Sequence, residues 1–576
     1  MLSNTDVAQA LTRIRTLMEL SGETFYKFTA YERAASAVEN APPLAGLAAA
    51  GQLTTLPGIG KSLAATIEEL LRTGTCEQLE VLQQRYPPTI FEVLGVSGIG
   101  IKTAALLFEQ YGIGSLADLE KAIDSGALDS VPRMGRKTLE NMRRGILAYR
   151  GRQRRTPLAK ALGIAREIMA FLQDGPPLHR LTYAGSLRRA EVTVGDIDIV
   201  CTSDHAAAVI ERFVQWDRAR AVLAEGPTKA SIWLEDGLQI DLRVLPDNVY
   251  GNLLQHFTGS REHNIQLREH ALRKSLRVSE NGILNLETGD VFTATEEAAV
   301  YAHLGMQYVP PELRSGMGEI DAALRGEVPA LIETADLRGD FHMHCTFSDG
   351  NQSLEEMIAA AASRGYEYHS ISDHSAGRGP KYGVTVENLR SQRARVAEIG
   401  DRFGVRTLCS SEVDILPDGS LDYDDEVLAQ LDIVVASVHS AFNLSREEMT
   451  RRLIRACESP HVHIIGHPTG RTIEGFPGYE FDTDAVFAAA ARTGTALEID
   501  GQPNRLDLPW ALAARAKTFG VKFTADSDAH DVSQLRNAEL AISQARRAGL
   551  TRDDVLNAQP LEAVLAFVRR KRERAS

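Results

Sequence analysis

The chain has 576 residues, 44% of them hydrophobic, which is enough for several domains with large cores. Its formal charge of −14 argues weakly against nucleic acid as a partner, because it describes only the average of the chain. No apolar run approaches the roughly 18 residues of a membrane span, and the five cysteines form no Cys-x-x-Cys motif, so we expect a soluble protein of a reducing compartment.

The N-terminal part, to about residue 150, is predicted to be helical. Val7, Leu11, Ile14 and Leu17 recur at helical spacing. Further on, two glycine-containing turns each precede a helix, and N–H groups at such a turn bind phosphate without reading bases. One such turn is more often only a tight turn, whereas two copies resemble helix-hairpin-helix motifs. The expected contacts to the DNA backbone are Gly58, Gly60, Lys61, Gly98, Gly100 and Lys102.

The next region combines a Gly-Ser turn with two closely spaced aspartates. Gly185 and Ser186 precede Asp196 and Asp198, which share one face of a predicted strand. Asp241 lies in a second alternating strand, and the strands are expected at 180–184, 196–201, 232–234 and 238–245, with a helix at 206–216. A lone Asp-x-Asp is usually a solvated strand edge. The Gly-Ser turn and Asp241 instead favour a pair of Mg²⁺ ions that supports phosphoryl transfer.

Residues 1–310 resemble the X-family DNA polymerases, the family of DNA polymerase beta. The resemblance rests on Gly-Ser-Leu-Arg-Arg…Gly-Asp-Ile-Asp at 185–198, Asp-Leu-Arg at 241–243 and Phe-Thr-Gly-Ser at 257–260. It implies that Asp196 and Asp198 bind two Mg²⁺ or Mn²⁺ ions and that Asp241 joins at the catalytic one. The implied contacts to the nucleotide or the template are Gly185, Ser186, Arg189, Gly195, Phe257, Gly259, Asn264 and Arg268.

Some positions depart from that family. His256 stands where the vertebrate enzyme has a tyrosine, and Arg261 where it has an aspartate. Thr66 aligns with the lysine of the vertebrate lyase, and Schiff-base chemistry requires an amine. We therefore expect any deoxyribose-phosphate lyase activity to be weak or to use another lysine, such as Lys61 or Lys27.

After a connector near residues 308–316, short apolar runs alternate with predicted helices. Such repeated units predict a barrel whose site gathers at the C-terminal ends of its strands. A lone histidine is more often structural than a ligand, but here acids and histidines end almost every apolar run, and such donors suit Mn²⁺, Zn²⁺ or Fe²⁺. The candidate ligands are His342, His344, Asp349, His374, Glu412, His439, His467, Asp528 and His530.

Residues 340–570 resemble the PHP (polymerase and histidinol phosphatase) domain, a distorted (β/α)7-type barrel with three metals. The resemblance implies three ligand groups: His342, His344, Glu412 and Asp528; Glu412, His439 and His467; Asp349, His374 and His530. The implied reaction is hydrolysis of a phosphodiester or phosphomonoester. Arg471 is a candidate phosphate contact, with a surface salt bridge as the alternative.

Together these features predict a multidomain α/β protein: helical DNA-end-binding domain 1–80, fingers 81–155, nucleotidyltransferase palm 156–250, thumb 251–312, linker 313–338 and PHP barrel 339–576. The leading hypothesis is a cytoplasmic, nucleoid-associated monomer. It would fill short gaps in DNA repair from deoxynucleoside triphosphates, on gapped or nicked DNA, with a 3′→5′ exonuclease and further 3′-phosphatase or abasic-site endonuclease activities. The alternatives are a barrel that serves only as a metal-stabilised scaffold, and a nucleotidyltransferase acting on a small molecule or an RNA end.

Overall fold

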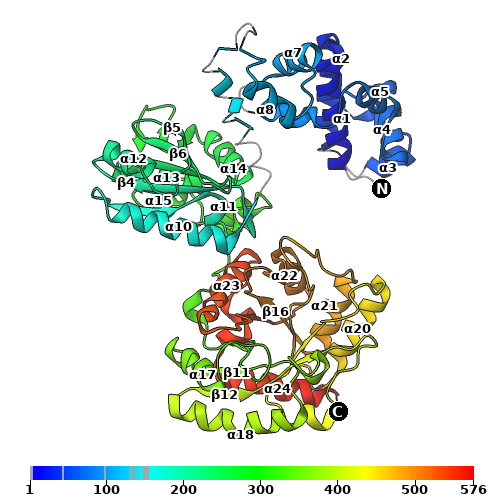
Figure 1. Cartoon of the computed structure of the whole chain (residues 1–576), viewed down its shortest axis with the longest axis vertical. Coiled ribbons are helices and arrows are strands. Elements are labelled where there is room, and N and C mark those ends of the chain that lie inside the picture. The colour runs from blue at the N-terminus through cyan, green and yellow to red at the C-terminus, as the bar shows by residue number, and fades with distance from the viewer. Residues whose placement is uncertain are drawn as a thin grey trace. The chain divides into compact units, whose positions relative to one another are not determined.

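The computed structural model describes residues 4–39, 41, 44–56, 58–96, 99–129, 131, 134–135, 138–140, 142–143, 145–146 and 155–575 (Figure 1). These residues belong to two compact units, Met1–Arg154 with Glu235–Gln239, and Arg155–Leu234 with Ile240–Ser576. A helical N-terminal region precedes mixed α/β parts, which confirms the expected multidomain α/β class.

The smaller unit is built from short helices around one apolar core. The predicted periodicity forms helix α1, whose Val7, Leu11, Ile14 and Leu17 are buried in that core. Helices α4 and α7 begin directly after Gly60 and Gly100. The helices are α1 (Asn4–Leu20), α2 (Phe25–Glu39), α3 (Leu44–Ala49), α4 (Lys61–Thr73), α5 (Glu77–Arg85), α6 (Ile90–Leu94), α7 (Ile101–Tyr111) and α8 (Leu116–Asp124).

The palm begins the larger unit with a sheet of strand order β2-β4-β7-β6-β5. The four predicted strands and the predicted helix are present. Strand β5 was not expected, because most of its residues are exposed and it carries little apolar alternation. The elements are β1 (Thr156–Pro157), α10 (Leu158–Gln173), β2 (Arg180–Tyr183), α11 (Gly185–Arg188), β3 (Thr193–Val194), β4 (Asp196–Thr202), α12 (Ala206–Val214), β5 (Ala221–Glu225), β6 (Lys229–Trp233) and β7 (Gln239–Leu245).

The thumb has its own core, and that core extends into the segment expected to be a linker. Ile320, Ala323 and Val328 pack into it, and the buried Arg314 forms an ion pair with Glu297. The start of residues 313–338 is therefore folded against the thumb. The elements are α13 (Tyr250–Thr258), α14 (Arg261–Leu272), β8 (Leu276–Ser279), β9 (Gly282–Asn285), β10 (Val291–Phe292), α15 (Glu297–His303) and α16 (Glu319–Arg325).

The C-terminal part is a distorted barrel of parallel strands. Strand β11 pairs with β12, and β13 to β17 pair in order. A parallel bridge between Met343 and Ala529 and a hydrogen bond from Ser372 N to Met343 O join residues 340–344 to both β17 and β11. The strands are β11 (Tyr368–Ile371), β12 (Arg406–Cys409), β13 (Glu412–Asp414), β14 (Val435–Ser437), β15 (Ile464–Ile465), β16 (Ala496–Asp500) and β17 (Phe523–Asp526).

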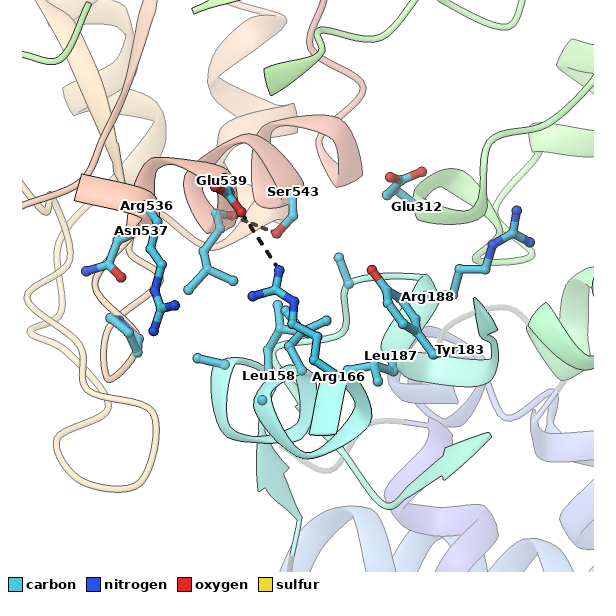
Figure 2. Close-up of a pocket in the computed structure, with 16 residues that line it drawn as sticks. Leu158, Arg166, Tyr183, Leu187, Arg188, Glu312, Arg536, Asn537, Glu539 and Ser543 are labelled. Carbon is cyan, nitrogen blue, oxygen red and sulfur yellow. Dashed lines mark hydrogen bonds and ion pairs between the residues drawn. The ribbon is translucent and has the colours of Figure 1, made fainter. Parts of the chain in front are cut away.

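Helices cover the outside of the barrel, and the ends of the barrel strands carry the predicted ligands. The helices are α17 (Leu354–Ser363), α18 (Val386–Phe403), α19 (Asp425–Leu428), α20 (Arg446–Glu458), α21 (Thr483–Thr493), α22 (Trp510–Lys517), α23 (Ala538–Arg547) and α24 (Leu561–Ala575). A cavity of about 350 Å³ lies between α10 of the palm and α23 of the barrel, where Arg166 faces Glu539 at 3.9 Å (Figure 2). None of the predicted metal ligands lines this cavity.

Candidate metal centres

Three aspartates of the palm lie on two neighbouring strands. Asp196 and Asp198 are on β4, and Asp241 is on β7, the next strand of the sheet. Burial, together with the charges of Asp196 and Asp241, raises the pKa of Asp198 to about 8. Full ionisation of this group at neutral pH is therefore unfavourable unless a cation joins it. An all-carboxylate set of donors suits Mg²⁺ or Mn²⁺.

The Gly-Ser turn lies directly against this group. Gly185 has φ +58°, and a Cβ added there would lie 2.0 Å from Oδ2 of Asp198, so only glycine fits. Ser186 follows in the first turn of α11. Gly195, by contrast, has open space around the position of a Cβ. The structure thus brings Gly185 and Asp198 together and leaves Gly195 accessible.

Arg189 connects this turn to the Phe-Thr-Gly-Ser segment. Its Nη1 donates a hydrogen bond of 2.6 Å to the carbonyl of Thr258. A Cβ at Gly259 would lie 3.2 Å from the same nitrogen, and the ring of Phe257 lies under the guanidinium of Arg243. The residues expected at the triphosphate and at the sugar therefore lie next to each other.

Asn264 and Arg268 lie further along α14. The amide of Asn264 donates to the carbonyl of His256 at 2.8 Å and accepts from Gln255 at 2.8 Å. Both polar ends of this amide are therefore bonded within the protein. Arg268 is exposed on the same helix.

The two glycine turns are partly described. A Cβ added at Gly60 or Gly100 would meet nothing within 4 Å, so each turn leaves room for an approaching group. Lys61 and Lys102 are exposed in the first turns of α4 and α7, and Gly58 has φ +80°. Gly98 lies outside the described residues.

Thr66, at the position of the vertebrate lyase lysine, and Lys27 each have a partner within the protein. Thr66 bonds to the carbonyl of Ser62 at 3.2 Å, and Lys27 pairs with Glu23 at 2.9 Å. Lys61 has an exposed side chain.

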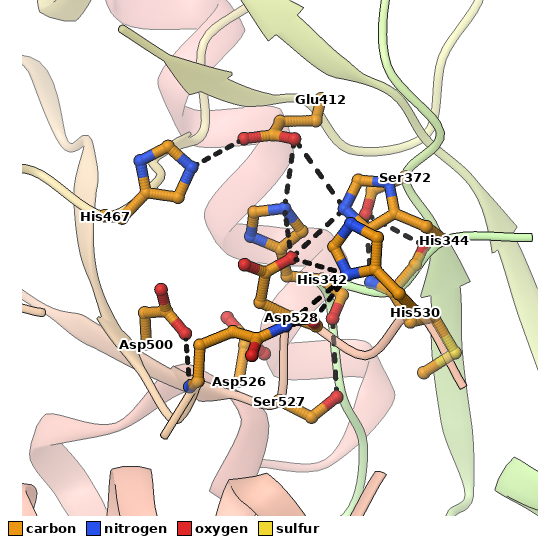
Figure 3. A network of polar contacts seen from close by, with 12 residues as sticks. His342, His344, Ser372, Glu412, His467, Asp500, Asp526, Ser527, Asp528 and His530 are labelled. Atoms are coloured by element: carbon orange, nitrogen blue, oxygen red, sulfur yellow. Dashed lines mark hydrogen bonds and ion pairs between the residues drawn. The ribbon is translucent and has the colours of Figure 1, made fainter. Parts of the chain in front are cut away.

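In the barrel, the predicted ligands converge on the buried carboxylate of Glu412 (Figure 3). Its Oε1 lies 2.8 Å from Nε2 of His467 and 3.1 Å from Nε2 of His439. Its Oε2 lies 2.8 Å from Nδ1 of His374, 3.4 Å from Nε2 of His342 and 3.7 Å from Nε2 of His344. One carboxylate thus faces five imidazoles.

Three groups of donor atoms lie close enough together to hold a metal each. They are His342, His344 and Asp528; His374, Glu412 and His439; and His344, Asp349, His374 and His530. His374 keeps the implied neighbours Asp349 and His530 and also lies beside Glu412 and His439. His467 contacts Glu412 without completing a group. His344 also joins Asp349 and His530, because its ring lies between Asp528 and Asp349.

Two further carboxylates orient these histidines. Nδ1 of His342 lies 2.6 Å from Oε1 of Glu498, and Nδ1 of His439 lies 2.6 Å from Oδ1 of Asp414. Such bonds fix the ring and leave the other nitrogen available to a metal. Glu498 was missed in the sequence. The pattern that could have revealed it is Leu-Glu-Ile-Asp in the buried strand β16, where acids alternate with apolar residues as they do at Asp196 and Asp198.

The imidazole nitrogens that face this centre fit divalent metals. Nε2 of His342 and Nδ1 of His344 are buried and have no hydrogen-bond partner among the described residues. They lie 3.4–3.7 Å from carboxylate oxygens, longer than typical hydrogen bonds and suited to a cation between the two groups. Mixed imidazole and carboxylate donors suit Mn²⁺, Zn²⁺ or Fe²⁺.

Arg471 forms no ion pair among the described residues, which corrects the interpretation as a surface salt bridge, while its contact to phosphate stays a prediction. Its guanidinium donates to the main-chain carbonyls of Arg505 and Leu506. Arg505 instead faces the ligands. Its Nε lies 3.8 Å from Oδ2 of Asp500, and beside burial its charge helps to lower the pKa of His467 to about 4. The sequence could not distinguish these two arginines, because their roles depend on how the loop folds.

Among the helices of the described residues, none combines the length and the apolar character of a membrane-spanning segment. The five cysteines are buried and unpaired.

Comparison with known proteins extends over nearly the whole chain. The DNA polymerase beta thumb family matches residues 253–315, a helix-hairpin-helix domain matches 2–76, and a SAM-like helix-hairpin-helix tandem matches 90–146. The DNA polymerase/3′-5′ exonuclease PolX of Bacillus subtilis (strain 168) is 36% identical over 568 residues, which are 98% of this chain and 99% of the relative.

Two other relatives match the C-terminal part alone. A probable phosphatase of Thermoanaerobacter sp. (strain X514) is 32% identical over 235 residues, 38% of this chain and 89% of the relative. A probable phosphatase of Syntrophotalea carbinolica is 30% identical over 252 residues, 41% of this chain and 98% of the relative.

Proposed function

The chain belongs to the PolX family of DNA polymerase/3′-5′ exonucleases, and we propose that its palm and its barrel carry the two opposing reactions of that name. The protein is a DNA polymerase joined to a metal-dependent phosphoesterase. The palm would add nucleotides to a primer in a short gap, and the barrel would remove nucleotides from a 3′ end. The likeness of the barrel to probable phosphatases supports a further action on terminal phosphomonoesters.

In the palm, the proposed chemistry is attack of the primer 3′-oxygen on the α-phosphate of an incoming nucleotide. Asp241 would accept the proton of the 3′-hydroxyl, and pyrophosphate would leave. Ser186 and Arg189 would donate hydrogen bonds to the triphosphate, and Gly195 would let the main chain approach it. Phe257 and Gly259 would lie against the sugar, Asn264 at the base and Arg268 at the template.

In the barrel, the proposed chemistry is attack of water on the phosphorus of the terminal phosphodiester. The bond to the 3′-oxygen of the preceding nucleotide would break, the terminal nucleotide would leave as a 5′-monophosphate, and the shortened strand would keep a 3′-hydroxyl. Arg505 would bind the phosphate, because its guanidinium faces the ligands, and Glu498 and Asp414 would keep His342 and His439 oriented. When bound, divalent metals supply charge neutralisation at phosphoryl oxygens in both sites and, in the barrel, a hydroxide near neutral pH.

We further propose Asp196, Asp198 and Asp241 as ligands of Mg²⁺ or Mn²⁺, and the nine barrel residues as ligands of Mn²⁺, Zn²⁺ or Fe²⁺. The partners would be gapped or nicked DNA, bound through the turns at Gly58–Lys61 and Gly98–Lys102, and deoxynucleoside triphosphates. The protein would act as a monomer in the cytoplasm, associated with the nucleoid, with the predicted domain boundaries except that the thumb extends to about residue 328.

The observation that carries this proposal is the presence of two chemically different clusters. One holds only carboxylates around Asp198, whereas the other surrounds Glu412 with imidazoles. Oxygen donors suit the metals of nucleotidyl transfer, and mixed donors suit hydrolysis.

Single-cluster substitutions on a gapped duplex test the proposal. Asp196→Ala with Asp198→Ala should abolish primer extension and spare degradation, and His342→Ala with His344→Ala should do the reverse. Asp204→Ala and Asp425→Ala, two exposed acids of the palm and barrel, are the matched controls. Extension that survives the palm double variant, or degradation that survives the barrel double variant, would refute the corresponding assignment.

A further inference from the structure

Exposed aromatic rings occur on loops that leave the metal ligands of the barrel. Phe442 lies three residues after His439, between β14 and α20, and Phe476 lies between β15 and α21 in the loop that begins at His467. Their side chains are 41% and 38% exposed. Loops that follow the strands of such a barrel lie on one face, the face of the site.

The two rings contact each other and a third, buried ring. The centroids of Phe442 and Phe476 lie 5.5 Å apart, and Phe442 is stacked on Tyr479 at 6.2 Å with an interplanar angle of 8°. The hydroxyl of Tyr479 donates to the carbonyl of Pro468, the residue after His467. Tyr479 thus connects the two exposed rings to the main chain next to the predicted ligand His467.

The backbone under both rings is held by hydrogen bonds. Arg452 donates to the carbonyl of Ser440 at 2.9 Å, which fixes the turn before Phe442. Thr472 bonds to Phe476 twice at 2.7 Å, once from N to the carbonyl and once from the Phe476 N–H to its hydroxyl. The backbone that carries Phe442 and Phe476 is therefore already fixed before a ligand binds.

A third loop of the same face adds a ring and a cation. This loop, residues 375–383, follows His374, and its two ends lie close together because Val384 N donates to the carbonyl of His374 at 2.9 Å. This loop exposes Tyr382, with Nζ of Lys381 4.7 Å from the ring centroid. Aromatic faces beside cations are the composition of surfaces that bind single-stranded nucleic acid.

We propose that Phe442 and Phe476 form a stacking site for the unpaired bases at the 3′ end of a DNA strand. This inference rests on the proposed exonuclease and names its substrate form, a single-stranded or frayed end. Stacking does not depend on base identity, so the rings would hold any terminal nucleotide while its phosphodiester lies at the ligands. Lys381 would contact the backbone of the strand.

The test compares ends with and without bases. Hydrolysis with Mn²⁺ is measured on a single-stranded oligonucleotide and on the same oligonucleotide whose 3′-terminal nucleotides lack bases. We expect the wild-type protein to show a KM about tenfold or more lower for the end that carries bases. Phe442→Ala and Phe476→Ala should raise that KM toward the abasic value and leave the abasic KM and kcat unchanged.

Matched variants separate stacking from folding. Phe403 is 39% exposed at the end of α18, just before a strand and so on the opposite face, and Phe403→Ala should change nothing. Phe442→Leu keeps apolar area without a π face and should behave like Phe442→Ala.

Three results would overturn the inference. They are an unchanged KM in both alanine variants, an equal rise for both kinds of end, and full recovery in Phe442→Leu. If the wild-type protein cleaved neither end, the proposed exonuclease itself would fail, which is a distinguishable outcome.

Discussion

Arg547 on α23 of the barrel donates a hydrogen bond of 2.6 Å from Nη1 to the main-chain carbonyl of Arg189 in the palm. The same side chain pairs with Glu191 at 3.0 Å, and Gln544 donates to the carbonyl of Ala190 at 3.0 Å. Ala190 has φ +54°, a conformation that an L-residue adopts only when its surroundings hold it there. The barrel therefore supports the palm loop that carries a proposed triphosphate contact.

Arg547→Ala should raise the KM for deoxynucleoside triphosphates about tenfold, because the Arg189 loop loses a hydrogen bond from a charged donor. Degradation of 3′ ends should be unchanged. Steady-state primer extension measures the effect, with the exposed Arg569→Ala on α24 as control. An Arg547→Ala protein with the wild-type KM would show that the palm loop holds its conformation without the barrel.

Gly185→Ala should abolish primer extension, because the new methyl group would overlap Oδ2 of Asp198 and φ is +58°. Gly195→Ala meets no atom within 4 Å and should fold normally, so any effect should be a higher KM for the nucleotide. Extension kinetics and circular dichroism of both variants provide the comparison. Equal kcat values for the two would contradict the close contact between Gly185 and Asp198.

Glu498→Gln should weaken metal binding in the barrel about 10- to 100-fold, because a carboxylate on Nδ1 orients His342 and strengthens it as a ligand. Elemental analysis after dialysis against graded Mn²⁺ measures this without relying on activity. Glu562→Gln, on the exposed face of α24, is the control. Metal content equal to that of the wild type would remove Glu498 from the centre.

Arg505→Ala should raise the KM for a 3′ end about tenfold, through loss of a charged contact to the phosphate. Arg471→Ala should leave that KM closer to the wild type and mainly destabilise the loop, because its guanidinium bonds to the carbonyls of residues 505 and 506. Exonuclease kinetics and limited proteolysis of the loop separate the two. A larger KM effect from Arg471 would reverse the assignment.

Glu297 should give the thumb an acid-sensitive stability. Burial opposes its ionisation, but the guanidinium groups of Arg314 and Arg188 outweigh burial and lower the pKa of Glu297 from its ordinary 4.5 to about 2. A lowered folded-state pKa stabilises the protein above pH 4.5, and this contribution of about 3 kcal/mol is lost as the pH falls from 4.5 to 2.

Glu297→Gln should remove that pH dependence and cost about 3–5 kcal/mol near neutral pH, because two arginines stay buried without their partner. Hydrogen exchange of α15 peptides, corrected for the intrinsic rate at each pH, follows the effect locally. Glu327→Gln, an exposed acid, is the control. A pH profile of α15 that stays the same in Glu297→Gln would contradict the lowered pKa.

Local patterns predicted those parts of the fold that depend on periodicity. Helix α1 and strand β4 lie where their apolar spacing indicated, because a 3.6- or 2-residue period determines which face is buried. Segment 313–338 was harder, since α16 is short and is held by the thumb core and by the pairing of Arg314 with the distant Glu297.

In the candidate sites, too, local sequence patterns predicted which residues take part, but not how distant residues are grouped. Most of the histidines and acids proposed as barrel ligands follow an apolar run, so the sequence could collect them, and the structure brings all of them except His467 into three groups. It could not show that His344 and His374 each take part in two groups, nor distinguish Arg505 from Arg471, because these depend on which strands and loops are neighbours. The helix-hairpin-helix contacts and the roles of Asn264 and Arg268 stay predictions.

The position of Glu412 has a consequence for how this barrel can diverge. Because five imidazoles share one carboxylate, replacing that single side chain would disturb every ligand group at once, whereas the surrounding strands would keep their packing. A descendant that has abandoned hydrolysis but kept the fold is therefore most simply recognised by a change at this one position.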